Sequence, residues 1–78
     1  MDFDEKIDCS GLKCPMPAMK AKKALTSMTV GQILLIVTTD KASCISIPSI
    51  TRQIGHELLD TAHEGNEYFY RVKKLAPA

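Results

Sequence analysis

Apolar and polar residues alternate along the chain in patterns that predict four strands and two helices. Strands are expected over residues 6–9, 32–38, 57–62 and 67–73. The second of these contains an unbroken apolar run over residues 33–37, which is typical of a strand at the centre of a sheet. A helix is expected over residues 18–28, because apolar side chains recur there at the spacing of one helical face: Pro17, Ala21, Ala24, Leu25 and Met28.

A second, shorter helix is expected to follow Ser46, a residue type that suits the N-cap position. Pro48 would then lie in the first turn, where a proline is tolerated. Ile47, Ile50 and Ile54 supply its apolar stripe, and Gly55 suits its C-terminal end.

The resulting order is β-α-β-α-β-β, with Gly65 and Asn66 forming a hairpin turn between the last two strands. This order predicts an α/β (α+β) two-layer sandwich. We expect one four-stranded mixed sheet with both helices on one of its faces.

Length and composition favour a single domain over residues 1–78, with a loose C-terminal tail over 75–78. The 78 residues are 45% hydrophobic and 24% charged, with a net charge of +1. So small a charge does not favour stable binding to nucleic acid or to a membrane surface. The longest apolar run, residues 33–37, is too short to cross a bilayer, and the acidic N-terminus does not resemble a secretory signal. These features predict a cytoplasmic protein.

The chain contains three cysteines, an odd number that argues against a disulfide scaffold. Their spacing from one another and from the two histidines lacks any paired metal-binding motif, so no metal site is expected. No cofactor is expected either. The residues of a type that can bind zinc are Cys9, Cys14, Cys44, His56 and His63.

Cys14 is the strongest candidate for chemistry, because it immediately precedes Pro15 at the start of the first expected helix. A helix N-terminus lowers the pKa of a thiol from about 8.5. A residue before proline favours the extended geometry of an N-cap, and proline suits the first helical position. Pro17 would then remove a further N–H from the first turn, so only a moderate lowering of the pKa is expected. The alternative is that Cys14 is a small buried apolar residue.

The stretch of residues 8–17 resembles the signature of the TusA/SirA-like sulfur-carrier family. Its core is Gly11-Leu12-x-Cys14-Pro15-x-Pro17, and the similarity extends over nearly the whole chain. The resemblance implies a two-layer α/β sandwich that accepts sulfane sulfur as a persulfide on Cys14 and relays it. The remaining motif residues would position this sulfur.

The resemblance also implies a sulfur-donor protein, of the cysteine desulfurase or rhodanese type, and a sulfur-acceptor protein. Family members serve tRNA thiolation, molybdenum-cofactor metabolism or sulfur oxidation. This chain has Asp40-Lys41 where the family often has Asp-Pro, and Ile45-Ser46 where it often has Arg-Asp. These departures predict that partner recognition differs from that of other family members.

Five further residues each allow a functional and a purely structural interpretation. Cys9 is either a resolving thiol for Cys14 or, more simply, a core residue at a strand end. Cys44 is either a second sulfur relay site or a half-buried loop residue. Three lysines on the first helix are either a solvated face or a surface that docks an acidic partner: Lys20, Lys22 and Lys23.

Two other functions remain open at this stage. One is a non-catalytic interaction or regulatory module, and the other is a thiol-disulfide redox protein that uses Cys9 with Cys14. A carrier that docks two partners in turn is expected to be a monomer.

Overall fold

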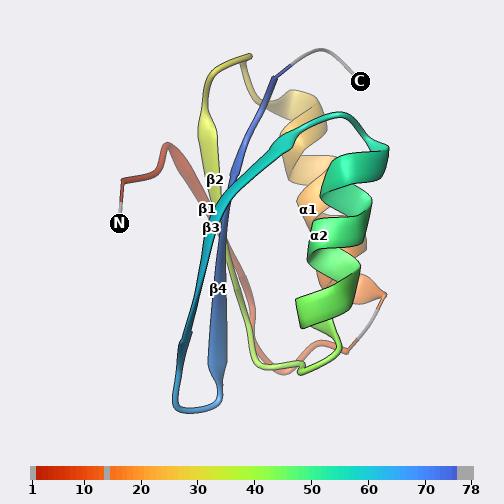
Figure 1. Cartoon of the computed structure of the whole chain (residues 1–78), viewed down its shortest axis with the longest axis vertical. Helices are drawn as coiled ribbons and strands as arrows, with labels where there is room; N and C mark the ends of the chain where they lie inside the picture. The colour runs from red at the N-terminus through yellow and green to blue at the C-terminus, as the bar shows by residue number, and fades with distance from the viewer. Residues whose placement is uncertain (1, 14, 76–78) are drawn as a thin grey trace.

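The computed structural model describes residues 2–13 and 15–75 (Figure 1). Strands and helices follow one another in the predicted order β-α-β-α-β-β. Their bounds are β1 (Glu5–Cys9), α1 (Met16–Ser27), β2 (Ile33–Thr38), α2 (Ser43–Gln53), β3 (Glu57–Glu64) and β4 (Glu67–Lys73).

The four strands form one mixed sheet in the order β1-β2-β4-β3. The β1–β2 pair is parallel, and the β2–β4 and β3–β4 pairs are antiparallel. Both helices cover the same face of the sheet, as the order of the elements predicted (Figure 1). Helix α1 packs against β1 and β2, and α2 packs against β3 and β4. The two-layer prediction is therefore confirmed.

Strand β2 lies between β1 and β4, which explains its unbroken apolar run. Leu34 and Ile36 belong to the core between the sheet and the helices. Leu35 and Val37 alternate with them and are also buried. The helices contribute their predicted faces to this core, including Ala21, Leu25 and Ile47.

Helix α1 begins two residues before the expected start. Its N-cap is Pro15 and not Cys14, and its first helical residue is Met16. Pro17 is therefore in the first turn, where backbone N–H groups have no helical acceptor and a proline costs little. Its side chain is fully buried.

Helix α2 begins at Ser43, three residues before Ser46, so the prediction that Ser46 is its N-cap was wrong. The reason is a turn made by Asp40, whose backbone carbonyl accepts the Ser43 N–H at 3.0 Å and whose carboxylate accepts the Ala42 N–H at 3.2 Å. Pro48 lies inside the helix and removes only one helical hydrogen bond. Ser46 Oγ is instead buried without a hydrogen-bond partner among the described residues.

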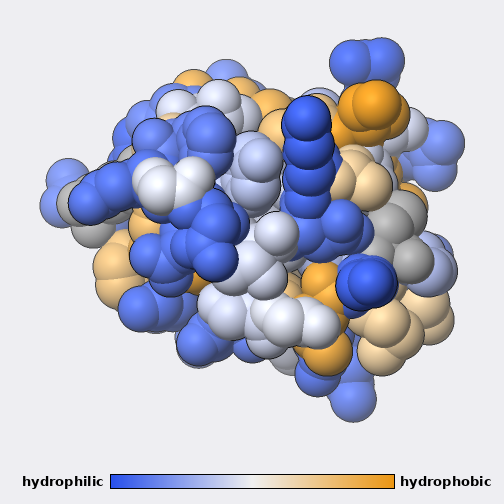
Figure 2. Space-filling model, turned by 90° about the horizontal axis from the view of Figure 1, so that it is seen from below, coloured by the Kyte–Doolittle hydropathy of each residue, from blue (hydrophilic) through white to orange (hydrophobic). Residues whose placement is uncertain are grey.

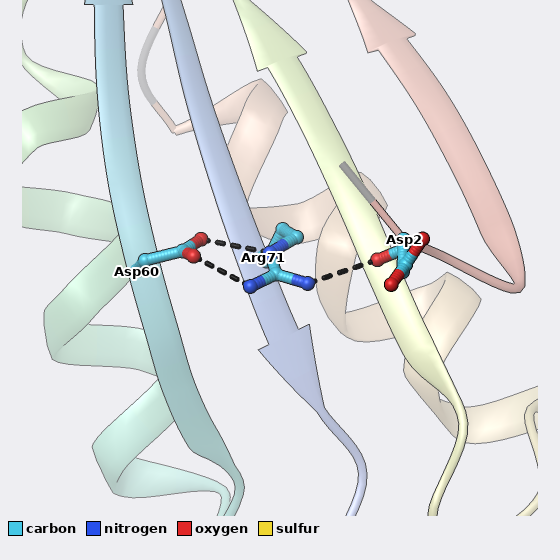
Figure 3. A network of polar contacts seen from close by, with 3 residues as sticks. All are labelled: Asp2, Asp60 and Arg71. Atoms are coloured by element: carbon cyan, nitrogen blue, oxygen red, sulfur yellow. Dashed lines mark hydrogen bonds and ion pairs between the residues drawn. The ribbon is translucent and has the colours of Figure 1, made fainter.

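The face of the sheet away from the helices carries a network of polar contacts (Figure 3). Arg71 on β4 donates through Nε to Asp60 Oδ1 at 2.9 Å and through Nη2 to Asp60 Oδ2 at 2.6 Å. Its Nη1 also donates to the backbone carbonyl of Asp2 at 3.1 Å. Hydrogen bonding from Arg71 lowers the pKa of Asp60. The network links the N-terminal segment to β3 and β4.

The C-terminal end of α1 is held by the segment that follows β4. Lys74 is buried, and its Nζ donates to the carbonyls of Met28 at 2.6 Å and Thr26 at 3.3 Å. A cation there also interacts favourably with the helix dipole. The next residue, Leu75, donates its N–H to Nδ1 of buried His56 at 3.2 Å. At Leu75, the first residue of the expected loose tail, the backbone is thus hydrogen-bonded, and residues 76–78 lie outside the described part.

The His56 contact predicts a pH dependence of stability. Burial, together with nearby Lys74, lowers the pKa of His56 below its ordinary value of 6.5. The folded state therefore binds this proton less readily than the unfolded state. Above pH 6.5 the neutral His56 therefore makes its full contribution to the free energy of unfolding. As the pH falls below that value, this contribution is lost and the protein becomes less stable.

Urea unfolding between pH 8 and pH 5 measures this effect in the wild type and in a variant of each histidine. His56→Gln retains an acceptor for the Leu75 N–H but cannot titrate, so its stability should fall less over this range. His63→Gln, which changes the exposed histidine, should retain the wild-type dependence. Equal pH profiles for wild type and His56→Gln would contradict the assignment.

Candidate functional site

The site predicted from the sequence lies in the loop that joins β1 to α1. Cys14 itself lies outside the described residues, so the site is defined by its neighbours. The backbone N–H of Ser10 donates to Asp8 Oδ1 at 3.0 Å, and that of Leu12 donates to the Cys9 carbonyl at 3.1 Å. The Leu12 side chain also packs against the core. These contacts fix the approach of the chain to Cys14.

Gly11 attaches the same loop to the neighbouring one. Its N–H donates to Oγ1 of Thr39 at 2.9 Å, and its φ of +82° is a conformation that favours glycine. Thr39 was not predicted as a site residue. It directly follows β2, and the carboxyl ends of adjacent parallel strands lie at the same edge of a sheet. This rule could have indicated from the sequence that Thr39 lies near the loop after β1.

The start of α1 offers fewer backbone donors than most helix N-termini. Pro15 and Pro17 have no N–H, and the N–H of Met16 donates to the Lys13 carbonyl at 2.9 Å. The N–H of Met16 is therefore not a free donor to the sulfur. Fewer donors mean weaker stabilisation of an anion at this helix end.

The surroundings of the loop are open to solvent. Lys13 and Pro15, the residues covalently bonded to Cys14, are exposed, and so is Met16. Figure 2 shows the end of the molecule at which both helices begin, where hydrophilic side chains surround smaller apolar areas. Ile45, in the first turn of α2, is 78% exposed. A macromolecular partner can thus reach this end of the molecule.

The two described cysteines lie in contrasting environments. Cys9 is completely buried in the core, and burial raises its pKa, while nearby Lys20 opposes that shift. A buried thiol of this kind is chemically inert.

Cys44 is exposed and free. It lies in the first turn of α2, not in the loop where the sequence pattern had placed it. It lines a cavity of about 280 Å³ beside Tyr70. The Tyr70 hydroxyl is paired with Ser43 Oγ at 2.9 Å. Burial, with a contribution from Cys44, raises the pKa of Tyr70 to about 12.

Both histidines have other contacts among the described residues. His56 is used in the contact with Leu75, and His63 stacks on Tyr68 with ring centroids 4.4 Å apart. Within residues 2–13 and 15–75, no three histidine, cysteine or acidic side chains are grouped to hold a metal ion. Neither helix in this part of the chain has the length and apolar character needed to span a membrane.

Comparisons with known proteins support this fold. The chain shares its fold with a SirA-like protein from Desulfitobacterium hafniense. The two structures superpose with a TM-score of 0.82 at 19% identity, over 94% of this chain and 100% of the other. The fold thus places the chain among small α/β two-layer proteins.

Sequence comparison identifies the family. The profile of the family described as "Sulfurtransferase TusA" matches residues 5–74. The "Sulfur carrier protein TusA" of Allochromatium vinosum is 40% identical over 73 residues, which cover 94% of this chain and 96% of that protein. The chain belongs to the TusA family of sulfur carriers, and its general role is in sulfur transfer between protein partners.

Proposed function

We propose that the protein accepts sulfane sulfur as a persulfide on Cys14 and relays it to an acceptor protein. The observation that supports this most directly is the loop around Cys14. Hydrogen bonds at Gly11 and Leu12 attach it to the scaffold on one side, and the start of α1 holds it on the other. Its flanking residues Lys13 and Pro15 remain exposed. A group-transfer site needs this combination of a fixed backbone and an accessible position.

The proposed transfer conserves electrons overall. The Cys14 thiolate attacks the outer sulfur of a donor persulfide, a new S–S bond forms, and the donor leaves as a thiolate. An acceptor thiolate then attacks the outer sulfur on Cys14, whose own thiolate is released. No metal or organic cofactor takes part in either step. The protein acts as a sulfurtransferase in the sense of a carrier between two other proteins.

The other motif residues act as positioning groups in this proposal. Gly11 permits the turn that brings its N–H to Thr39, and Leu12 anchors the loop in the core. Pro15 and Pro17 restrict the backbone on the C-terminal side of the sulfur. Because two prolines also remove N–H donors, the thiolate gains only modest stabilisation from the helix.

The protein is proposed to work as a monomer in the cytoplasm, where its thiols stay reduced. Its donor would be a cysteine desulfurase or a rhodanese-type protein. Its acceptor would determine whether the sulfur serves tRNA thiolation, molybdenum-cofactor metabolism or sulfur oxidation. Ile45 is exposed and stands where the family often has an arginine. The protein's partner choice would therefore differ from that of relatives with the charged residue.

A disulfide redox function using Cys9 is disfavoured by the position of that residue. Cys9 is completely buried and belongs to the core, so pairing it with another thiol would disrupt packing. A relay through Cys44 has less support than one through Cys14, because Cys44 lies outside the motif. Its exposure nevertheless makes it the necessary control in any loading experiment.

Sulfur loading is the direct test. The reduced protein is incubated with a cysteine desulfurase and cysteine, or with a rhodanese and thiosulfate, and its intact mass is measured. We expect a gain of one sulfur atom that is reversed by dithiothreitol. The absence of a gain with either donor and with inorganic polysulfide would refute the carrier function and favour a non-catalytic interaction module.

A further inference from the structure

A groove separates α1 from the outer edge of the sheet. It has a volume of about 440 Å³ and is lined by residues of α1 and β1: Ile7, Asp8, Lys20, Lys23, Ala24 and Ser27. This volume is within the range of about 300–1,000 Å³ that is usual for binding sites. β1 is an edge strand, paired only with β2 on its other side. The groove therefore lies beside a strand edge that can accept another extended chain.

The walls of the groove have contrasting character. Half-buried Ile7 and Ala24 provide apolar surface, while Lys20 and Lys23 are exposed on the helix side. Asp8 is the only acidic residue among the lining residues. Its carboxylate accepts the Ser10 N–H in the turn after β1, and hydrogen bonding from the side chain and then the backbone of Ser10 lowers its pKa. The groove thus presents two lysines whose charges face solvent.

The groove leads towards the motif loop. Burial raises the pKa of Cys9, and Lys20 is close enough for its charge to oppose that rise. Cys9 is the last residue of β1, and the loop that carries Cys14 follows directly. A chain lying in the groove would therefore approach the predicted site.

We propose that this groove binds an extended, acidic segment of a sulfur-transfer partner, laid along the free edge of β1. In an extended chain, alternate side chains point in opposite directions. Acidic residues at every second position would then face Lys20 and Lys23, with their methylene groups against Ile7 and Ala24, and the residues between them would lie on the opposite face of the sheet. Main-chain hydrogen bonds to a sheet edge supply affinity in this binding mode. This inference rests on the proposed carrier function and names the recognition element of its partner.

The structure also distinguishes among the three lysines weighed from the sequence. Lys20 and Lys23 line the groove together with Ala24 and Ser27, which occupy the same helical face. Lys22 does not line it, although it is exposed on the same helix. Lys22→Glu is therefore a matched control, since it changes the net charge as much as either groove substitution.

The probe is a synthetic peptide in which valine and glutamate alternate, titrated into the ¹⁵N-labelled protein. We expect saturable shifts in the amide signals of β1 and of the groove side of α1. Lys20→Glu should weaken binding about tenfold or more, and so should Lys23→Glu, whereas Lys22→Glu, which changes the net charge by the same amount, should change it by less than about twofold. A peptide with lysine in place of glutamate should not bind.

Three results would overturn the proposal: no saturable shifts, shifts confined to another surface, or equal effects of Lys22→Glu and the groove substitutions. Tighter binding of an RNA oligonucleotide to the groove would also overturn it. Sulfur loading from inorganic polysulfide requires no docking, so the groove variants should load as the wild type does. A wild-type protein that takes up no sulfur would refute the proposed function, whereas loss of peptide binding alone would refute only the groove.

Discussion

Cys14→Ser is expected to abolish sulfur loading by every donor, enzymatic or inorganic. A serine side chain has no sulfur with which to form the S–S bond of a persulfide, and its hydroxyl is not ionised at neutral pH. The substitution removes only the reacting atom, and the loop contacts at Gly11 and Leu12 do not depend on it. The measurement is intact mass after incubation with donor, followed by alkylation to locate the modified residue.

The other two cysteines provide the controls for this experiment. Cys44→Ser replaces an exposed thiol and should load like the wild type. Cys9 is buried in the core, so alanine is the better substitute there, because a serine hydroxyl would be buried. Cys9→Ala should also load fully, at some cost in stability. Loading of Cys14→Ser to the wild-type level would disprove the assignment, and loss of loading in Cys44→Ser would move the site to α2.

Ile47→Ala is expected to reduce the free energy of unfolding by about 2–5 kcal/mol. Ile47 is completely buried and belongs to the core shared by α2 and the sheet. Removing its side-chain carbons loses their transfer free energy and leaves a cavity that the packed surroundings refill only in part. In a domain of 78 residues, such a loss is a large fraction of the roughly 5–15 kcal/mol of stability usual for proteins.

Ile45→Ala is the matched control, since it makes the same substitution two residues away in the same helix. Ile45 is 78% exposed, so its truncation should change stability by less than about 0.5 kcal/mol. Urea denaturation followed by circular dichroism measures both variants. Similar losses for the two would show that α2 does not pack through Ile47 as described.

Local sequence patterns were sufficient to predict most of the architecture. Alternation in 67–73 predicted a strand, and the unbroken apolar run of β2 correctly indicated its central position. Gly65, with a φ of +61°, forms the predicted hairpin turn. These features depend on the periodicity of neighbouring residues, which a single sequence displays directly.

Helix starts were predicted less accurately, because they depend on contacts that local propensity does not reveal. Ser46 is a good N-cap by residue type, but the turn made by Asp40 begins α2 earlier. A proline within the first turns did not mark the start of the helix, because it removes only one hydrogen bond. The same limit applies to α1, whose cap is Pro15.

The sequence by itself determined the order of elements, the two-layer class, and the motif through which the chain is related to sulfur carriers. These follow from local periodicity and from a short run of residues around Cys14. Only the tertiary structure decided that Cys9 is buried while Cys44 is exposed, that Thr39 anchors Gly11, and that two of three neighbouring lysines share a groove. Burial and contact between distant residues arise when strands and helices pack together, and one-dimensional spacing does not record which side chains then meet.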